Sequence, residues 1–321
     1  MWTNSCKFAD HSKKSIKKDM PTIIRMSWGL ANRMFQYSYY LYLRQRGVDA
    51  YIDYCGVLEG EHERVDWKHV FPQAPLRQAT KGMLLRYGGG TGWIAKFRRH
   101  ALPCTTSVHY HKDAMTICSD DELRRYHYLM GVFQNVPMVL DVADQVRRSF
   151  RFSTMKDGVN RGLIREMSEV ESVAVHVRKG HDYQRLPWFA KTCLPEYYER
   201  AFEEMRRRID NPQFYVFTDN PEWVRQNMPH ANYRLIDWNP VVGRGCHWDM
   251  QLMASCKHQI IANSTYSWWA AFLNYNQQKQ VIAPKQWFAY ENDEHRIHDG
   301  VQCPGWTLMC RTADIPFQLF S

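Results

Sequence analysis

A pair of cationic residues, Arg178-Lys179, directly follows the apolar run Ser172–Val177, and the loop continues as Gly180-His-Asp-Tyr183. A guanidinium presents a planar fork of N–H donors to phosphate oxygens, and an ammonium supplies a point charge. Cations at the mouth of a buried strand therefore predict a site for a phosphate-bearing ligand.

Asn263-Ser264-Thr265 lies between an apolar run and a predicted helix. Ser, Thr and Asn are the preferred N-cap residues, so an ordinary helix cap is one interpretation. The free N–H groups of a helix N-terminus also bind anions, so the second interpretation is another part of the phosphate site. Gly29 opens a turn of similar kind, but neither a G-x-G-x-x-G nor a G-x-x-x-x-G-K-[ST] motif is present, which disfavours nicotinamide-dependent oxidoreductases and P-loop hydrolases.

The cationic loop at Arg178 and the segment Asn263-Ser264-Thr265 can form one site only if a parallel sheet brings the ends of their strands together. Residues 22–27, 32–46 and 48–53 read as strand, helix and strand, whereas residues 57–119 are loop-rich or short-helical. In the C-terminal half, strands and helices alternate. We predict strands at residues 172–177, 214–218, 233–236, 258–262 and 280–283, with helices at 195–209, 221–227, 247–257 and 266–275. That alternation indicates a doubly wound α/β domain, whose ligands bind beyond the carboxyl ends of the strands.

The composition is that of a globular protein: 321 residues, 45% hydrophobic and 23% charged. It excludes disorder and fibrous folds and suits one large or two medium α/β domains. The net charge of +9 predicts an anionic partner, and residues 1–19 carry +3 of it without an apolar signal-peptide core. This tail is a hypothetical contact to an anionic membrane surface.

The nine cysteines are scattered without a C-x-x-C pair, which is typical of a cytoplasmic protein. His109 and His111 lack partners at the usual metal-ligand spacings, so no metal site is predicted. The aromatic residues Tyr37, Tyr39, Tyr40 and Tyr42 and the pair Trp268-Trp269 are expected in the core rather than as sugar platforms.

Several segments together resemble the α-1,2-fucosyltransferases, glycosyltransferase family 11, of the bacterial type. They are Trp28-Gly-Leu-Ala-Asn-Arg-Met-Phe-Gln-Tyr37, Gly131-Val-Phe-Gln134, His176-Val-Arg-Lys-Gly-His-Asp-Tyr183, Phe217-Thr-Asp-Asn220 with Trp223, Asn263-Ser-Thr-Tyr-Ser-Trp-Trp-Ala-Ala-Phe-Leu273, and Val281-Ile-Ala-Pro-Lys285 with Trp287. They occur in the family's order from about residue 22 to 287.

The resemblance implies a GT-B-like fold of two Rossmann-like domains facing a cleft. We expect a basic extension at residues 1–19, an acceptor-side domain at 20–155 and a GDP-sugar-binding domain at 156–321. The implied reaction is inverting transfer of L-fucose from GDP-β-L-fucose to the 2-hydroxyl of a galactose residue. It belongs to surface polysaccharide or O-antigen assembly in the cytoplasm, with peripheral membrane association on a lipid-linked acceptor and no nucleic acid partner.

The resemblance also implies roles for individual residues. Arg178 is expected to stabilise the leaving diphosphate without a metal or other cofactor. Asp182 is the candidate base, with neighbouring His181 as another; a dissociative transition state that needs no strong base is the alternative. The remaining residues expected to bind GDP-fucose are Gly29, Asn32, His176, Lys179, Asp249, Asn263, Ser264 and Thr265. His176 and Asp249 would recognise guanine; a core histidine and a solvated helix carboxylate are the structural interpretations of the same residues.

Two segments depart from the family pattern. Lys179 stands where a second Arg is usual and His181 is extra, which affects the placement of Asp182; Asp182 could instead only orient Arg178 or Tyr183. Arg33 replaces the usual Gln, as a donor contact or a surface residue. The alternative functions are an α-1,6 or protein O-linked fucosyltransferase, a sugar-nucleotide-binding protein without catalysis, and a basic nucleic-acid-binding protein.

Overall fold

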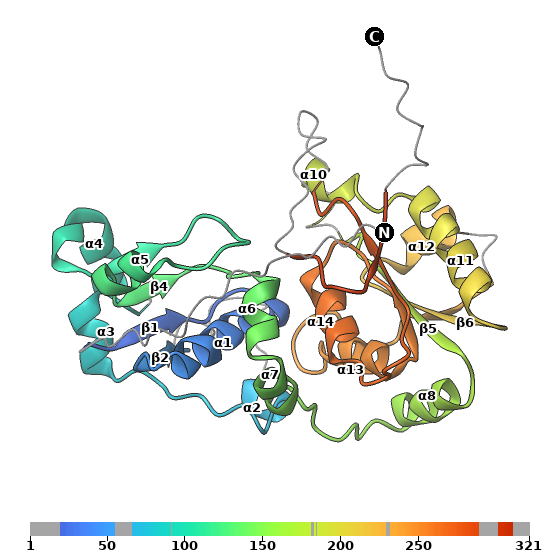
Figure 1. Ribbon diagram of the computed structural model, residues 1–321, viewed down its shortest axis with the longest axis horizontal. Helices are drawn as coiled ribbons and strands as arrows, with labels where there is room; N and C mark the ends of the chain where they lie inside the picture. Colours follow the sequence, from blue (N-terminus) through green and yellow to red (C-terminus); the bar gives the residue numbers. More distant parts are fainter. Residues whose placement is uncertain are drawn as a thin grey trace, which may run out of the picture.

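The computed structural model describes residues 20–54, 66–90, 92–180, 183, 185–228, 232–288 and 301–310, and these form two α/β units side by side (Figure 1). One unit contains a four-stranded sheet and the other a six-stranded sheet, and all strand pairs are parallel. The predicted α/β architecture of two Rossmann-like units is confirmed. The division of the chain at residues 155–156 stays a prediction, and the tail 1–19 lies outside the described residues.

The N-terminal sheet has the strand order β2-β1-β4-β3. Its strands are β1 (Thr22–Arg25), β2 (Ala50–Asp53), β3 (Val108–Tyr110) and β4 (Tyr128–Met130). Helix α1 (Leu30–Gln45) is the crossover between β1 and β2, as the residue pattern predicts. Strands β3 and β4 were not predicted, because each is only three residues long and too short to show alternation.

The C-terminal sheet has the order β10-β9-β8-β5-β6-β7. Its strands are β5 (Ser172–Val177), β6 (Gln213–Thr218), β7 (Arg234–Ile236), β8 (His258–Ile260), β9 (Val281–Pro284) and β10 (Thr307–Met309). The chain order reverses between β5 and β8, the topological switch point of a Rossmann fold, where a crevice opens for ligands. The prediction that residues 280–283 form the last strand was wrong, because β10 adds one more edge strand beside β9.

The other helices of the described chain fill the connections between strands. In the N-terminal unit they are α2 (Trp67–Val70), α3 (Lys81–Tyr87), α4 (Trp93–Ala101), the 3₁₀ turn η3 (Pro103–Thr105), α5 (Asp120–Arg125), α6 (Val136–Asp141) and α7 (Ala143–Ser149). In the C-terminal unit they are α8 (Gly158–Glu169), α10 (Pro187–Ala190), α11 (Pro195–Arg208), α12 (Pro221–Asn227), α13 (Trp248–Ser255) and α14 (Thr265–Leu273). Within the described chain, we find no helix with the length and hydropathy to span a bilayer.

An aromatic cluster joins the two units. Phe35 of α1 packs its ring 5.0 Å from Trp268 and 4.8 Å from Trp269, both of α14, and Phe150 meets Trp269 edge-on. The two tryptophans are fully buried, and Tyr37, Tyr39 and Tyr40 are buried as well. The predicted core role is confirmed for these five residues, whereas Tyr42 is only half-buried and packs against the core. The aromatic cluster holds α1 and α14 together.

Candidate active site

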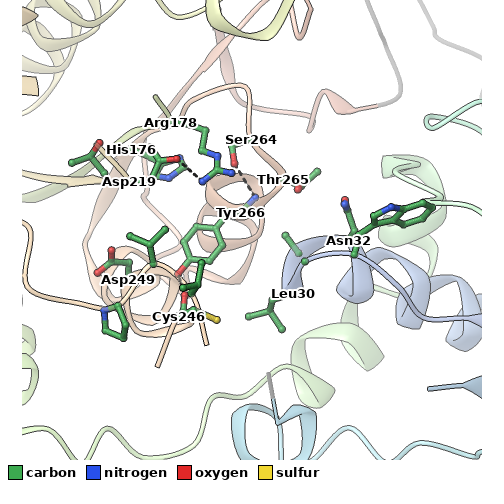
Figure 2. Close-up of a pocket in the computed structure, with 17 residues that line it drawn as sticks. Leu30, Asn32, His176, Arg178, Asp219, Cys246, Asp249, Ser264, Thr265 and Tyr266 are labelled. Atoms are coloured by element: carbon green, nitrogen blue, oxygen red, sulfur yellow. Dashed lines mark hydrogen bonds and ion pairs between the residues drawn. The ribbon is translucent and has the colours of Figure 1, made fainter. Parts of the chain in front are cut away.

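A cavity of about 410 Å³ lies between the two units (Figure 2). The first turn of α1 forms its N-terminal side, and the segments that follow β5, β6 and β8 form the other side, together with residues from α13 and the loop before it. Its lining residues are Trp28, Gly29, Leu30, Ala31, Asn32, His176, Arg178, Thr218, Asp219, Pro240, Val241, Val242, Cys246, Asp249, Ser264, Thr265 and Tyr266. The cavity therefore lies at the carboxyl ends of the strands, where a doubly wound α/β domain is expected to bind its ligand.

Arg178 is held in this cavity by Asp219. Its Nη1 donates to Oδ2 of Asp219 at 2.5 Å, while Oδ1 of Asp219 accepts the backbone N–H of Lys179 at 2.7 Å. The Asp219 side chain is 7% exposed, whereas that of Arg178 is 26% exposed. The carboxylate thus fixes the direction of the guanidinium, whose five N–H donors suit it to contact several oxygens of a ligand at once.

Two helix N-termini border the same cavity. Gly29 is the N-cap of α1 and has no side chain to accept the first N–H groups of that helix, and no acidic residue occurs in the first turn. Ser264 caps α14, where its Oγ accepts the N–H of Tyr266 at 3.3 Å. Both N-termini line the same cavity as Arg178, and two positive helix ends together with a cation suit an anionic ligand.

Asn32 is oriented by a residue from the segment after β4. Its Oδ1 accepts a hydrogen bond from Nε2 of Gln134 at 2.9 Å. Because the oxygen is occupied, the amide NH₂ group of Asn32 is the part that can donate to a ligand in the cavity.

His176 and Asp249 provide polar groups at another part of the wall. His176 is buried on β5, and burial, assisted by the charge of Arg178, lowers the pKa of its imidazole to about 3, so the ring is neutral. Its Nδ1 has no hydrogen-bond partner among the described residues. This nitrogen is itself buried, and a buried nitrogen without a hydrogen-bond partner costs free energy.

Asp249, in the first turn of α13, is a buried carboxyl group. Burial raises its pKa from 3.8 to about 6, partly offset by Nδ2 of Asn239, which donates to Oδ1 at 2.7 Å. Behind it, Asn160 donates to Oδ1 of Asn239 at 2.8 Å. This network fixes one carboxylate oxygen in place and leaves Oδ2 as an acceptor for a ligand.

Tyr266 connects the elements around the cavity. Its hydroxyl donates to the carbonyl of Cys246 at 2.6 Å and accepts the N–H of Met250 at 2.8 Å. Burial raises the pKa of this phenol well above 10, so it stays protonated. Tyr266 therefore braces the loop before α13 against α14, and its ring lies 5.8 Å from that of His176.

The structure brings most of the predicted site residues together. Those that line the cavity are Gly29, Asn32, His176, Arg178, Asp249, Ser264 and Thr265. Asp182 and His181 lie outside the described residues, so the candidate bases stay predictions.

Three residues are placed elsewhere. Lys179 is 4% exposed, and its Nζ donates to the carbonyl of Ala190 at 2.6 Å. Asn263 is 2% exposed and donates from Nδ2 to the carbonyl of Trp287 at 3.0 Å. Arg33, predicted as a donor contact or a surface residue, is fully buried beside Tyr54. All three side chains support the fold instead of lining the cavity.

The residue-level predictions omitted Trp28, Asp219, Tyr266 and the Pro240–Val242 segment from the site. Asp219 directly follows β6, and its position at the carboxyl end of a strand was a signal that could have identified it. The others come from a turn, a helix and a loop, whose side-chain directions depend on tertiary packing.

One group of the described residues could hold a metal ion, namely His109, His111, Cys118 and Glu122. None of the four lines the cavity.

Residues 110–309 match the model of glycosyl transferase family 11. The chain is similar to the alpha-1,2-colitosyltransferase of Escherichia coli, with 32% identity over 50% of this chain and 56% of that protein. It is 36% identical to the O-antigen biosynthesis glycosyltransferase WbnK of Escherichia coli over 38% of this chain and 40% of that one.

A third relative is the galactoside alpha-(1,2)-fucosyltransferase 1 of Saimiri sciureus, 30% identical over 32% of this chain and 28% of that protein. The matched segments thus span between about a quarter and slightly more than half of these relatives. Since the family model covers more than half of the chain, this protein belongs to glycosyl transferase family 11.

Proposed function

We propose that this protein transfers L-fucose from GDP-β-L-fucose to the 2-hydroxyl of a galactose residue, with inversion, in bacterial surface polysaccharide or O-antigen assembly. The observation that carries the proposal is the convergence of Arg178 with the N-termini of α1 and α14 in one interdomain cavity. A diphosphate is the part of the donor that such an arrangement suits.

In the proposed reaction, the bond between the anomeric carbon of fucose and the diphosphate oxygen breaks, and its electron pair leaves with GDP. Arg178 and the N–H donors of the two helices stabilise the charge that develops on the diphosphate. Neither a metal nor another cofactor takes part in this step. Asn32 donates its amide to the same region from the other unit.

The acceptor hydroxyl forms the new bond on the opposite face of the sugar, and its proton passes to a base. Asp182 is the residue we propose as that base. Its carboxylate takes the proton during attack and releases it to solvent after the glycoside leaves.

Guanine occupies the part of the cavity that His176 and Asp249 line. The ionised Asp249 accepts hydrogen bonds from the N1–H and amino group of guanine, and the neutral imidazole of His176 lines the same part of the cavity. Adenine has neither the N1–H nor the 2-amino group and would leave this carboxylate without those two donors, so the arrangement favours guanine over adenine.

The location we propose is the cytoplasm, at the inner membrane, where a lipid-linked oligosaccharide presents galactose. No disulfide bond joins cysteines of the described chain, in keeping with a reducing compartment. The name of the O-antigen relative supports the same type of acceptor.

Colitose is the competing donor sugar, because one relative is a colitosyltransferase. Colitose is fucose without the 3-hydroxyl, so both sugars place the same anomeric carbon beside the diphosphate. A site that hydrogen-bonds the 3-hydroxyl would discriminate strongly between them.

The test is incubation of the protein with GDP-fucose or GDP-colitose and a panel of galactose-terminated glycans, followed by NMR of the product linkage. We expect an α-1,2-fucosylated galactoside. The Arg178→Lys variant should lose about 10²–10³ in turnover. Arg225→Lys is the matched control, because Arg225 pairs with Asp237 outside the cavity. Equal turnover by both variants, or another linkage, would contradict the proposal.

A basic nucleic-acid-binding protein is the remaining class. It predicts tight, salt-dependent RNA binding that the Arg178→Lys change leaves almost intact. A GDP-sugar-binding protein without catalysis predicts tight GDP-fucose binding and no release of GDP. Titration of RNA and GDP, beside the turnover assay, separates these classes.

A further inference from the structure

The cluster of His109, His111, Cys118 and Glu122 joins β3, the loop after it and the first turn of α5. One ligand atom of each residue lies within 4.8 Å of all the others. Nε2 of His109 is 3.4 Å from Nδ1 of His111 and 3.2 Å from Oε1 of Glu122, and Sγ of Cys118 is 3.9 Å from the same Nδ1. We call these four residues the His–Cys–Glu cluster.

These separations suit a tetrahedral zinc ion. With bonds of about 2.0–2.3 Å, neighbouring ligand atoms of a tetrahedron lie about 3.3–3.8 Å apart. Two imidazoles, a thiolate and a carboxylate are all zinc ligands, and the thiolate disfavours magnesium and calcium. Four protein ligands close the coordination sphere, which is typical of a structural site.

The surroundings also orient the ligands. Nε2 of His111 is 2.7 Å from Oγ1 of Thr116, so His111 can offer Nδ1 to a metal while Nε2–H donates to the hydroxyl. The ring of His109 stacks on that of Tyr126 at 4.7 Å. Ser119 holds Oε2 of Glu122 through its N–H at 2.7 Å, which leaves Oε1 directed at His109.

We propose that the His–Cys–Glu cluster binds one structural Zn²⁺ ion. This departs from the sequence-based expectation, in which His109 and His111 had no partners. The ion ties the loop of residues 111–118 to β3 and α5. That loop accepts hydrogen bonds from the segment after β4: Gln134 donates its N–H to Ala114 and Asn135 its Nδ2 to Met115. Zinc thus supports the segment that orients Asn32.

The test measures zinc in the full-length purified protein by plasma mass spectrometry after gel filtration. We expect about one zinc per chain. Cys118→Ser and His111→Gln should retain less than about a tenth of it, whereas Cys104→Ser and His100→Gln, at exposed positions, should retain all of it. A zinc content that Cys118→Ser leaves unchanged would overturn the proposal. A zinc content below about 0.1 zinc per chain in wild-type protein that has been dialysed against zinc would overturn it as well.

Cobalt gives an independent readout in case a variant folds poorly. Wild-type protein loaded with Co²⁺ should show a thiolate-to-cobalt charge-transfer band and the visible absorption bands of tetrahedral Co²⁺. The Cys118→Ser variant should lose the charge-transfer band. A chelator should lower the melting temperature of the wild type and not that of Cys118→Ser. Cobalt binding without a thiolate band, or a chelator effect of equal size in both proteins, counts against the site. None of these measurements depends on transferase activity.

A second inference rests on α4, at the outer end of the N-terminal unit (Figure 1). Trp93, Ile94 and Phe97 are 77%, 51% and 55% exposed, and α4 has no buried residue. The spacing i, i+1, i+4 places them on one face of the helix. We call these three residues the α4 face.

Hydrogen bonds fasten α4 from its basic side. Arg99 donates from Nη1 to the carbonyls of Gly88 at 2.7 Å and Gly90 at 2.9 Å, and Arg98 donates to those of Thr105 and Leu85. The helix is therefore held by its arginines while its large apolar side chains point outward.

The charge around α4 is one-sided. Residues 67–112 contain eight Lys and Arg and no Asp or Glu, a local net charge of +8 in a chain whose total is +9. Exposed Lys81, Arg86 and Lys96 belong to this set. Exposed Trp, Ile and Phe beside cations suit the acyl and headgroup layers of an anionic bilayer. Nucleic acid would use the cations and Trp93, but gives Ile94 no partner.

We infer that the α4 face inserts into the surface of an anionic phospholipid bilayer; this rests on residues 67–112 alone and not on the fucosyl transfer. The test is co-sedimentation with vesicles of phosphatidylcholine, with and without phosphatidylglycerol. Replacement of Trp93, Ile94 and Phe97 by Ser should lower partitioning at least about tenfold, and Lys96→Glu about fivefold or more. Val159→Ser with Tyr275→Ser, 60% and 57% exposed, is the matched control.

A variant without residues 1–19 is tested separately in the same vesicle experiment. This deletion should leave most of the partitioning to vesicles in place. Partitioning carried wholly by that tail, or unchanged by the triple replacement, would refute the inference. Binding to single-stranded RNA at equal salt that exceeds vesicle binding would also refute it and favour a nucleic acid partner.

Discussion

The indole N–H of Trp269 donates to the carbonyl of Ala31 at 2.9 Å, so a residue of α14 is hydrogen-bonded to the first turn of α1. Ala31 lines the cavity between the units, and Trp269 is fully buried. The bond sets the position of the α1 N-terminus relative to the C-terminal unit. The geometry of the cavity is thus determined by a contact between the two units.

Trp269→Phe should destabilise the protein by about 1–3 kcal/mol, because it removes this bond and leaves a small cavity in a packed core. Urea unfolding measures the change, and GDP titration should show weaker binding from the displaced α1 terminus. Trp93→Phe on the exposed α4 face is the matched control, expected within about 0.5 kcal/mol of wild type. Equal stability of both variants would show that the bond does not join the units.

Asp249 should make both stability and GDP binding depend on pH. Burial raises its folded-state pKa from 3.8 to about 6, so its contribution to stability is full below about pH 4 and is lost as the pH rises through 6. Two pKa units correspond to about 3 kcal/mol at most. Thermal unfolding of wild type and Asp249→Asn across this window should give curves of different slope.

GDP binding should show the opposite trend, since guanine donors require the ionised carboxylate. We expect affinity to rise about tenfold between pH 5 and pH 7. The neutral His176, with its pKa lowered to about 3, does not titrate in this range. Calorimetry with Asp249→Asn should give a flat profile, while Asp237→Asn should keep the wild-type one. A rise of equal size in Asp249→Asn would assign the pH effect to another group.

Gln134→Glu tests the orientation of Asn32. A carboxylate cannot donate to Oδ1 of Asn32, so the amide of Asn32 turns its NH₂ toward the introduced carboxylate and its oxygen toward the donor. Turnover should fall about tenfold or more, as for a lost donor to developing charge. Gln145→Glu, on α7 and outside the cavity, serves as the control. Full activity of the Gln134→Glu protein would exclude Asn32 as a phosphate donor.

Trp28 has φ of 64°, a left-handed conformation that is strained for a side chain other than glycine. Trp28→Gly and Trp28→Ala both remove the 48% exposed ring, but only the first relieves the strain. Trp28→Gly should therefore be more stable than Trp28→Ala by about 1 kcal/mol, and both should bind the donor less tightly than wild type. Denaturant titration compares the two, and the reverse order of stability would contradict the strain.

The sequence predicts the sheets better than the direction of individual side chains. The run Ser172–Val177 is apolar and bounded by polar residues, so its strand was predicted to the residue. Arg178 and Lys179 both follow it, but successive side chains of an extended chain point to opposite sides. Arg178 shares the side of His176 and enters the cavity, whereas Lys179 turns toward Ala190.

Arg33 and the His–Cys–Glu cluster show two features that the sequence alone does not reveal, namely the direction of a side chain and the proximity of residues that are distant in the chain. Asn32 and Arg33 differ by about 100° around α1, so one faces the cavity and the next turns into the N-terminal unit. Cys118 and Glu122 are nine and thirteen positions from His109, a spacing without a known zinc signature, and only the turn between β3 and α5 brings them together. In both cases the information resides in tertiary geometry.

Because residues of both units line one cavity, any ligand bound there also becomes part of the contact between the units. The free energy of binding that ligand would add to the free energy of domain docking, so the two processes would be thermodynamically linked. In the proposed reaction, release of GDP would therefore weaken the contact between the units. The distance between the two units would then report whether the cavity is occupied.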